Sequence, residues 1–388
     1  MKIAFCIENF ITTRGGAEQY VHDLSLLLTE RGHEVHIYTM KSRRRSEEQL
    51  HIHMVNMFSG PRFLRTILFA LRCRREVTGR EFDIIHSFGR TWGMDIFQPL
   101  GGSQMAGLVG NLRSISNPLR RYLKVLTYIL SFRRIAYFLV EKIQIKETKI
   151  IIAISAMVKK DLIHYCHLSS EKVRIVRNGV DLKRFHPDNR EQFRAATRRE
   201  LGLTDDDIFI LFVAHNFRLK GLQTLIMALK HIQCISPENR FKVGVLGAGK
   251  VKQYSEYARK MGVVDRIIFV SNSDMPSHYY AAADISVHPS FYDPSALVVL
   301  EAMASGIPVI TTTYCGTSEI IEEGKEGFIV QTPADIFEMA DRIIDLSDSE
   351  LRRKMGEAGR RRAEDFPYSR NMEEILDIYD EYTGAYPR

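Results

Sequence analysis

Hydrophobic residues fall into short runs that alternate with longer amphipathic stretches through the first half of the chain. The runs are rich in Ile, Val and Phe, which is typical of strands buried in a parallel sheet. They lie at 2–7, 34–39, 82–86, 150–155 and 173–177. The stretches between them carry apolar residues at helical spacing. The pattern therefore predicts an α/β fold with a doubly wound parallel sheet.

The same alternation restarts in the second half of the chain. Strands are predicted at 208–214, 241–246 and 266–270, and helices at 222–232, 254–261, 336–346 and 351–364. Pattern and composition change around 178–190, so we place the interdomain hinge there. The chain is expected to form two Rossmann-like domains, 1–180 and 181–368. A last helix at about 369–388 is expected to pack back on the first domain.

The stretch from 288 to 310 reads as a strand end, a tight loop, a short helix and another strand. Asp293 and Pro294 lie where the helix is expected to begin, because Asp caps free N–H groups and Pro is tolerated in the first turn. A helix N-terminus attracts phosphate, and Glu301 follows Leu297 by about 6 Å along the axis. This helix is able to hold the phosphate and ribose of a nucleotide. The alternative is an ordinary amphipathic helix with a capped start.

Two other loops carry candidate phosphate contacts. Arg218 and Lys220 lie in a strand-to-helix loop of the second domain, where two cations beside a helix start favour a diphosphate pocket without a metal. The alternative is a solvated basic turn. Gly15 and Gly16 precede the first helix and allow a close backbone approach. Their spacing differs from GxGxxG, which argues against a nicotinamide dinucleotide.

Composition and charge place the protein among soluble globular chains with anionic partners. The 388 residues are 45% hydrophobic and 26% charged, and the formal net charge is +7. The five cysteines are scattered without metal-type spacing, so we expect free thiols in a reducing compartment. The first residues read as a strand and not as a signal peptide, and no uncharged run reaches the roughly 18 residues of a membrane span.

Residues 111–146 interleave cationic, apolar and aromatic side chains at helical spacing. The cations are Arg113, Arg120, Arg121, Lys124, Arg133, Arg134, Lys142 and Lys146, against the single acid Glu141. This pattern favours contact with an anionic membrane surface. One alternative is a long domain helix with a solvated basic face. Nucleic acid is another, but no nucleic-acid motif accompanies the charge.

Few residues indicate other chemistry. The sole Asp-x-Asp pair, Asp205 and Asp207, precedes a strand, which is the wrong end for a metal site in a parallel sheet. HExxH, P-loop and GxSxG motifs are absent. His86 ends a predicted strand, where ligand sites of α/β sheets usually lie, and it is an acceptor-side candidate. A structural role for His86 is the alternative.

Taken in order, the motifs resemble the retaining, nucleotide-sugar-dependent glycosyltransferases of family 4, which have the GT-B fold. The resemblance covers nearly the whole chain. It rests on the loop at 15–18, the hinge at 177–181, the loop at 217–221, and the segment at 288–309. The loop from Asn216 to Gly221 and the basic helices are similar to those of the lipopolysaccharide core glucosyltransferases. The resemblance implies two domains that face each other across a cleft.

The resemblance also implies roles for single residues. The donor diphosphate is expected to lie against Arg218, Lys220, Gly15, Gly16 and the amides of Ser295, Ala296 and Leu297. Glu301 is expected to hold the ribose hydroxyls and Asp293 the sugar, while Arg184 reaches the phosphates. The family normally has glutamate where this chain has Asp293. Relatives often carry His or Asp in the loop that here holds Gly101-Gly102-Ser103, so Asp95 is the acceptor-side candidate.

The function implied is transfer of a hexose from a UDP-sugar to a lipid-linked or lipopolysaccharide-core acceptor, with retention of configuration. The enzyme is expected to be cytoplasmic and peripheral on the inner face of the cell membrane. It is expected to need neither metal nor cofactor and to bind no nucleic acid. The alternatives are a GT-B sugar-nucleotide epimerase and a non-catalytic nucleotide-sugar-binding scaffold.

Overall fold

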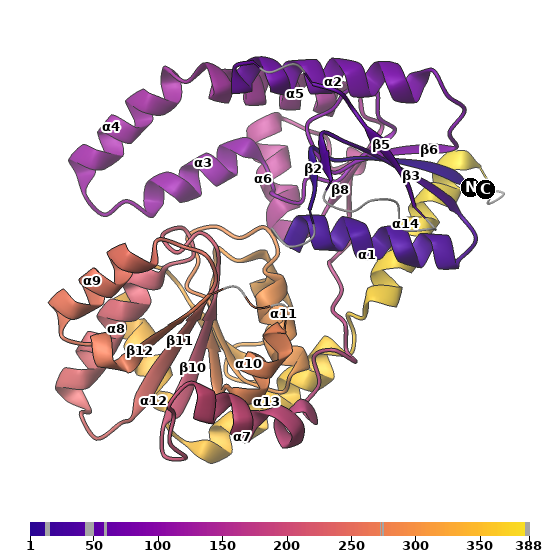
Figure 1. Ribbon diagram of the computed structural model, residues 1–388. Helices are drawn as coiled ribbons and strands as arrows, with labels where there is room; N and C mark the ends of the chain where they lie inside the picture. Colours follow the sequence, from indigo (N-terminus) through magenta and orange to yellow (C-terminus); the bar gives the residue numbers. More distant parts are fainter. Residues whose placement is uncertain (12–15, 43–49, 58–59, 272, 274, 385–388) are drawn as a thin grey trace. The chain divides into compact units, whose positions relative to one another are not determined.

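A computed structural model describes the chain except residues 12–15, 43–49, 58–59, 272, 274 and 385–388 (Figure 1). The chain divides into two compact units. Unit 1 comprises Met1–Arg177 with Ser369–Arg388, and unit 2 comprises Asn178–Tyr368. Unit 1 thus contains the last helix, α14 (Tyr368–Thr383), except its first residue, although that helix follows unit 2 in the sequence.

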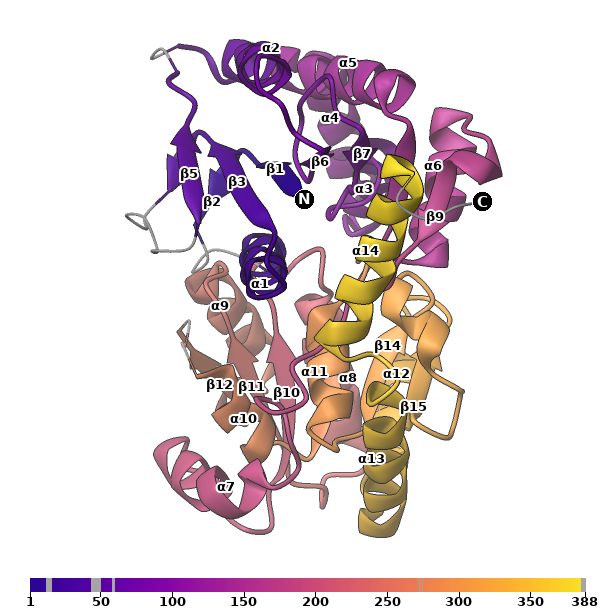
Figure 2. The ribbon, with the colours of Figure 1, turned by 90° about the vertical axis from the view of Figure 1, so that its right-hand side faces the viewer.

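Unit 1 is built on a seven-stranded sheet in which every pairing is parallel. The spatial order is β5 (His51–Met54), β3 (Glu34–Thr39), β1 (Lys2–Cys6), β6 (Ile84–Ser87), β7 (Ile96–Phe97), β8 (Ile150–Ala153) and β9 (Val173–Ile175). Side chains alternate between the two faces of a strand. Ile3 and Phe5 therefore pack with α1 (Gly16–Glu30) and α14, whereas Ala4 and Cys6 pack under α2 (Arg62–Thr78). Figure 2 shows these helices around the sheet.

The predicted strands agree with the observed ones within about two residues, but β5 was not predicted. The short strands β2 (Asn9–Phe10) and β4 (Lys41–Ser42), which pair with each other, were missed as well. The remaining helices of unit 1 are α3 (Gln104–Arg113), α4 (Pro118–Ile129), α5 (Phe132–Glu147) and α6 (Ala156–Cys166), with a 3-10 turn, η1 (Ser170–Lys172).

The basic region at 111–146 is broken into separate helices. The Asn117 side chain accepts a hydrogen bond from Arg120 N at 2.9 Å and caps α4, and the Ser131 side chain accepts from Arg134 N at 3.4 Å and caps α5. The alternative of one long helix is therefore wrong. Each cap satisfies N–H groups that a continuous helix would have bonded internally.

Unit 2 holds a second parallel sheet, of six strands. Its order is β12 (Ile267–Val270), β11 (Phe241–Leu246), β10 (Ile208–Val213), β13 (Ile285–Val287), β14 (Val309–Thr312) and β15 (Gly327–Val330). One face packs against α8 (Leu222–Ile235), α9 (Val251–Met261) and α12 (Ile336–Asp345). The other packs against α10 (Pro276–Ala282), α11 (Leu297–Ala304) and α13 (Ser349–Ala363). Two 3-10 turns, η2 (Val264–Arg266) and η3 (Gly316–Ile320), complete the unit.

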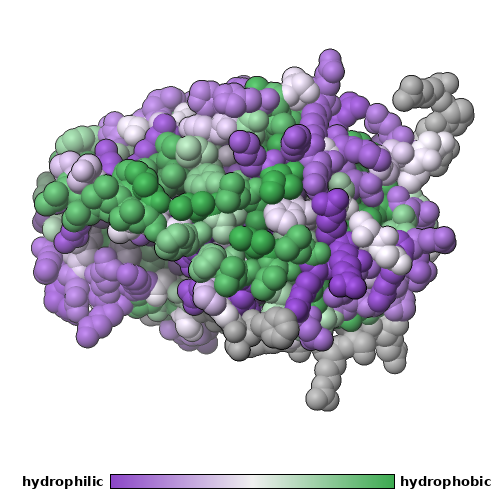
Figure 3. Space-filling view, turned by 90° about the horizontal axis from the view of Figure 1, so that it is seen from above, coloured by the Kyte–Doolittle hydropathy of each residue, from purple (hydrophilic) through white to green (hydrophobic). Residues whose placement is uncertain are grey.

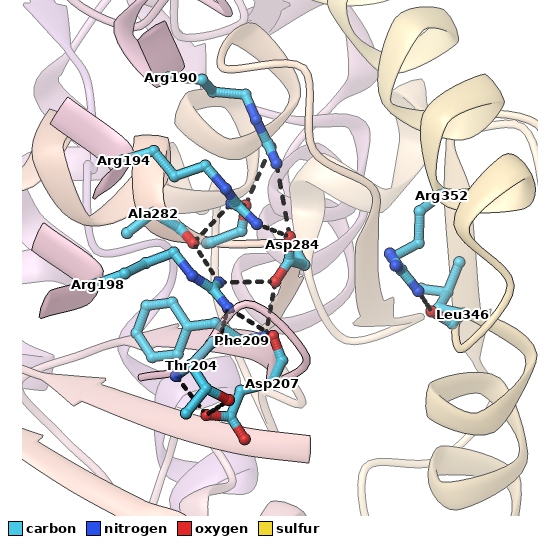
Figure 4. Close-up of polar contacts among 11 residues, drawn as sticks. Arg190, Arg194, Arg198, Thr204, Asp207, Phe209, Ala282, Asp284, Leu346 and Arg352 are labelled. Atoms are coloured by element: carbon cyan, nitrogen blue, oxygen red, sulfur yellow. Dashed lines mark hydrogen bonds and ion pairs between the residues drawn. The ribbon is translucent and has the colours of Figure 1, made fainter. Parts of the chain in front are cut away.

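The segment expected to be part of the hinge continues into a helix, α7 (Asn189–Glu200), whose arginines bind one carboxylate (Figure 4). Arg190, Arg194 and Arg198 lie four residues apart and reach Asp284 at 3.5, 2.7 and 3.1 Å. They also donate to the carbonyls of Ala282 and Ala283 at the end of α10. Cations at a helix C-terminus satisfy its free carbonyls and its dipole. Helix α7 has no buried apolar stripe. Its ion pairs with Asp284 and its hydrogen bonds to the end of α10 hold it in place instead.

Candidate donor site and acceptor-side cavity

Three side chains from two loops of unit 2 meet at the carboxyl ends of its central strands. Lys220 Nζ lies 2.6 Å from Asp293 Oδ2, and His288 Nε2 lies 2.8 Å from the same oxygen. Lys220 also donates to the carbonyl of Tyr292 at 3.1 Å. Lys220 follows β10, and His288 and Asp293 follow β13, which is the neighbouring strand. The topology therefore brings together residues far apart in the sequence.

The two loops approach each other through Gly221. Its φ of +80° lies in the left-handed region, and a side chain there would collide with the carbonyl of Pro289. Phe291 N donates to Leu219 O at 2.8 Å across the same junction. Glycine at this position lets the Lys220 loop lie directly against the segment that carries Asp293.

Asp293 is a buried carboxylate held in its charged form. Burial alone would raise the pKa of Asp293, but the Lys220 ammonium and the bond to His288 outweigh burial and hold that pKa well below its usual range. Burial lowers the pKa of His288, partly offset by Asp293. His288 was recognised only as part of a motif, and the structure adds it to the site.

The expected helix cap at Asp293 is wrong. The helix begins at Leu297, and Asp293 instead forms a β-bridge with Cys315 while its carboxylate binds Lys220 and His288. Among the described residues, no side chain caps the start of α11. The helix therefore presents its first backbone amides without a side-chain acceptor, at the position predicted from Ser295, Ala296 and Leu297 to meet a phosphate.

Glu301 lies one turn into α11 and accepts a hydrogen bond from Tyr280 Oη at 2.8 Å. Burial raises the pKa of Glu301, whereas Tyr280 and the charge of Arg184 lower it. Arg184 thus lies near enough to act on Glu301 electrostatically. Both residues were expected on the donor side, and the structure brings them together.

The remaining donor-side predictions fall in loops. Arg218 shares the loop of Lys220, and its charge lowers the pKa of Tyr254, which burial raises. Gly16 is the first residue of α1 in unit 1, and it is exposed. Gly15 lies outside the described residues.

His86 is a core histidine and not an acceptor contact. It lies within β6 and is fully buried, its Nδ1 is 2.6 Å from Tyr379 Oη of α14, and its ring packs on Phe5 and Phe88. Burial lowers the pKa of His86 to about 3. The prediction for His86 is corrected because a neutral imidazole beneath α14 cannot reach an acceptor in this conformation.

Asp95 lies at the wrong edge of the sheet for the predicted role. It precedes β7 and so lies at the amino end of a parallel strand, whereas ligand sites form at the carboxyl ends. Its carboxylate accepts from Ile85 N at 2.9 Å and bonds Tyr382 of α14. Asp95 therefore joins the sheet to α14, and its assignment as a catalytic residue is corrected.

A cavity of about 80 Å³ does lie at the carboxyl ends of β6 and β7. Its lining includes Glu8, Arg90 and Glu141, with Arg90 Nη1 bound to Glu8 Oε1 at 3.0 Å. Glu141 accepts from Gln104 N at 3.0 Å, and burial raises the pKa of Glu141 to about 7. These residues were missed. The available signal was Glu141 itself, the single acid in the basic region.

Two family models match the chain. Residues 14–184 match "Glycosyltransferase Family 4", and residues 193–362 match "Glycosyl transferases group 1". The chain belongs to the family 4 type of GT-B glycosyltransferases. This glycosyltransferase therefore has the predicted fold of two parallel-sheet α/β domains.

Named relatives of this glycosyltransferase differ in their sequence identity to it and in the length of chain that aligns. Spore coat protein SA of Bacillus subtilis is 35% identical over 54% of this chain and 59% of that protein. Lipopolysaccharide glucosyltransferase WaaG of Escherichia coli is 23% identical over 86% of each chain. A WaaG crystal structure gives a TM-score of 0.81 at 22% identity, covering 97% of this chain and 99% of that one. Anabaena Alr3699/HepE in complex with UDP-glucose gives 0.74 at 18% identity, covering 98% and 100%.

Proposed function

We propose that this glycosyltransferase transfers a hexose from a UDP-sugar to a lipid-linked or lipopolysaccharide-core acceptor, with retention of configuration. The donor half of the proposal rests on the Lys220–Asp293–His288 cluster beside the uncapped start of α11. The UDP-glucose complex of a protein with the same fold supports a UDP-sugar donor. The lipopolysaccharide glucosyltransferase among the relatives supports the acceptor class.

The chemistry required of unit 2 is stabilisation of a leaving diphosphate. We propose that Lys220 and Arg218 supply positive charge to this diphosphate, and that the first amides of α11 donate hydrogen bonds to it. When a diphosphate binds, it competes with Asp293 for the Lys220 ammonium. Asp293 keeps its bond to His288, and its carboxylate is then available to accept a hydrogen bond from a sugar hydroxyl. Glu301 accepts hydrogen bonds from the ribose hydroxyls, and Arg184 reaches the phosphates. We propose that the transfer needs no metal.

We propose that a hydroxyl group of the acceptor reaches into the small cavity of unit 1. Glu141 replaces Asp95 as the proposed acceptor-side carboxyl, because its pKa of about 7 suits exchange of a proton with a hydroxyl group near neutral pH. Arg90 and Glu8 line the same cavity and offer polar contacts to a sugar or phosphate.

Membrane attachment is proposed through an apolar strip on unit 1. No side chain of α4 is buried, and large apolar residues of α4, α5 and the turn between them lie exposed, as the green band of Figure 3 illustrates. They are Leu119, Tyr122, Leu123, Leu126, Ile129, Leu130, Phe132, Ile135, Leu139 and Ile143. Cations beside the strip complement anionic lipid. In the described part of the chain, no helix is both long and apolar enough to cross a bilayer.

The decisive experiment is a panel of nucleotide sugars scored by thermal shift and by product analysis. The cognate UDP-sugar should raise the melting temperature with the logarithm of its concentration. It should be hydrolysed slowly alone and consumed faster with a lipid-linked acceptor. An altered sugar formed without acceptor supports an epimerase instead. Stabilisation by UDP without turnover of any donor supports a binding scaffold.

A further inference from the structure

Histidines and a glutamate gather where β5 pairs with β3 in the sheet of unit 1. Strand β5 is the outermost strand of that sheet (Figure 2). His51 is the register partner of His36, and Glu34 precedes His36 by two residues, so all three side chains lie on one face. One ligand atom from each lies within 4.8 Å of the other two. Among the described residues, this group is the one spaced to hold a metal ion.

The three side chains are close enough for an ion to replace the hydrogen bond between Glu34 and His36. Glu34 Oε1 lies 2.7 Å from His36 Nε2, and the rings of His36 and His51 stack with centroids 4.7 Å apart and planes at 23°. Metal bonds to imidazole nitrogen and carboxylate oxygen are about 2.0–2.2 Å long. A tetrahedral ion bound to both atoms would separate them to about 3.3 Å, so the exposed Glu34 side chain moves outward from its present 2.7 Å when the ion binds. The exposed His51 ring turns out of its stack on His36 to add a third bond from the neighbouring strand.

His53 supplies the support that metal-binding histidines usually have. Its Nε2 lies 2.8 Å from His36 Nδ1, and its ring stacks on Tyr38 with centroids 4.7 Å apart. With an ion on Nε2, the proton of His36 resides on Nδ1 and is donated to His53. That bond fixes the tautomer and the direction of the His36 ring.

The site is open to solvent on one side. Glu34 and His51 are exposed whereas His36 is buried, so an ion can enter and keep water in its remaining positions. Lys2 lies 3.5 Å from Glu34 Oε1 and would give up that contact. Imidazole with carboxylate favours Zn²⁺, Ni²⁺ or Cu²⁺ over the oxygen-seeking Mg²⁺ and Ca²⁺.

We propose that Glu34, His36 and His51 bind one divalent transition-metal ion, with His53 as the residue that positions His36. The ion joins the edge strand β5 to β3 and stabilises the edge of the sheet. The proposal is independent of the transferase reaction, because its residues belong neither to the Lys220–Asp293 cluster of unit 2 nor to the lining of the acceptor-side cavity of unit 1.

Calorimetry on the full chain, stripped of metal with a chelator, tests the proposal with Zn²⁺, Ni²⁺, Mg²⁺ and Ca²⁺ near pH 7.5. We expect one equivalent of Zn²⁺ or Ni²⁺ to bind and to raise the melting temperature by several degrees. Mg²⁺ and Ca²⁺ should do neither. Zn²⁺ binding that is absent, or is matched by Mg²⁺, overturns the proposal.

Variants assign the ligands. His51→Ala removes an exposed ring and should weaken Zn²⁺ binding at least tenfold, while His164→Ala, an exposed histidine on α6, should leave it unchanged. His53→Ala should weaken affinity without changing the stoichiometry, as expected of a positioning residue. The visible absorption of a Co²⁺-loaded chain should change in His51→Ala. Unchanged affinity in His51→Ala would assign the metal to the free cysteines or another site and refute the proposal.

Discussion

Lys220 joins the two loops of the donor site through its ammonium, which bonds the Asp293 carboxylate and the Tyr292 carbonyl. Its ammonium holds Asp293 in the charged form, in the loop that leads into α11. The sequence predicted both residues because each belongs to a recognisable motif. The bond between them was not predictable, because it depends on β10 and β13 being neighbours in space although separated in the chain.

Lys220→Ala should lower the rate of transfer about 10²–10³-fold, the usual effect of removing one group that stabilises developing charge. Because Asp293 then loses its counter-ion, the variant should also unfold more easily, by about 3–5 kcal/mol. Initial rates and urea unfolding check both. The control Lys252→Ala removes an exposed cation of α9 and should change neither. A transfer rate within threefold of wild type in a folded Lys220→Ala would refute this role.

Glu141 shows the limit of reading burial from sequence. It lies on a basic amphipathic helix, yet it is buried and lines the cavity, because α5 turns that side toward the sheet. The sequence pattern identified the helix face that meets solvent. It could not show that one acid points inward.

Glu141→Gln should change how stability depends on pH. Burial raises the pKa of Glu141 to about 7, so between the unfolded value of about 4.5 and pH 7 the folded state keeps a proton that the unfolded state releases. The contribution of Glu141 to the free energy of unfolding of the wild type is therefore fully present below about pH 4.5 and is lost as pH rises through 7. The variant should gain up to about 3 kcal/mol over wild type between pH 5 and pH 8. Urea unfolding followed by Trp92 fluorescence measures it, with exposed Glu171→Gln as the control that should run parallel to wild type.

Helix α7 shows, at the scale of elements, what hydrophobic patterning misses. The spacing of hydrophobic residues predicted the strands and most helices, and their positions were correct within a few residues. α7 buries only Thr197 and Arg198, so it carries no apolar stripe to detect. Edge strand β5 was missed for a related reason, because its alternating histidines do not look hydrophobic.

Asp284→Ala should destabilise unit 2 strongly. It leaves three arginines without their shared carboxylate and leaves Phe209 N, which donates to Asp284 at 2.8 Å, without its acceptor. Losing one partner of a buried ionic network costs about 3–5 kcal/mol. The loss should appear in circular dichroism but not in Trp92 fluorescence, since the single tryptophan lies in unit 1. Asp206→Ala, an exposed partner of Arg240, should cost under about 0.5 kcal/mol. Equal losses in the two variants would mean that the network does not hold α7.

The strip on α4 and α5 should bind vesicles through charge and apolar contact together. The full chain should sediment with anionic vesicles, less so with zwitterionic ones and less at high salt. Replacing Arg120, Arg121, Arg133 and Arg134 with alanine should release it. Replacing four exposed cations of unit 2, Lys230, Lys252, Arg259 and Lys260, is the charge-matched control and should not. Release by both sets would indicate general electrostatic attraction in place of a defined strip.

At the scale of the whole molecule, unit 1 is formed from both ends of the chain, and unit 2 from the segment between them. The pattern of strands predicted two domains, but only packing shows why the last helix belongs to the first. α14 closes the core of unit 1 with Met372, Ile375, Ile378 and Tyr379, and it covers His86. Asn371 bonds Tyr20 Oη of α1 at 2.9 Å, and Tyr382 bonds Asp95. Unit 1 therefore lacks part of its core until the end of the chain is in place.

Ending the chain at residue 367 should destabilise unit 1 and spare unit 2. The truncation removes four core side chains and exposes the apolar face of β1, β3 and β6. Each buried side chain of this size contributes about 1.5–3 kcal/mol, so their sum approaches the whole stability of an ordinary domain. Trp92 fluorescence should then report unit 1 unfolded or melting far below wild type, while UDP still shifts the melting of unit 2. The milder Tyr379→Phe, which removes only the hydroxyl bonded to His86, should lower the Trp92 transition by about 1 kcal/mol. If the truncated chain kept the wild-type Trp92 transition, α14 would not be part of the core of unit 1.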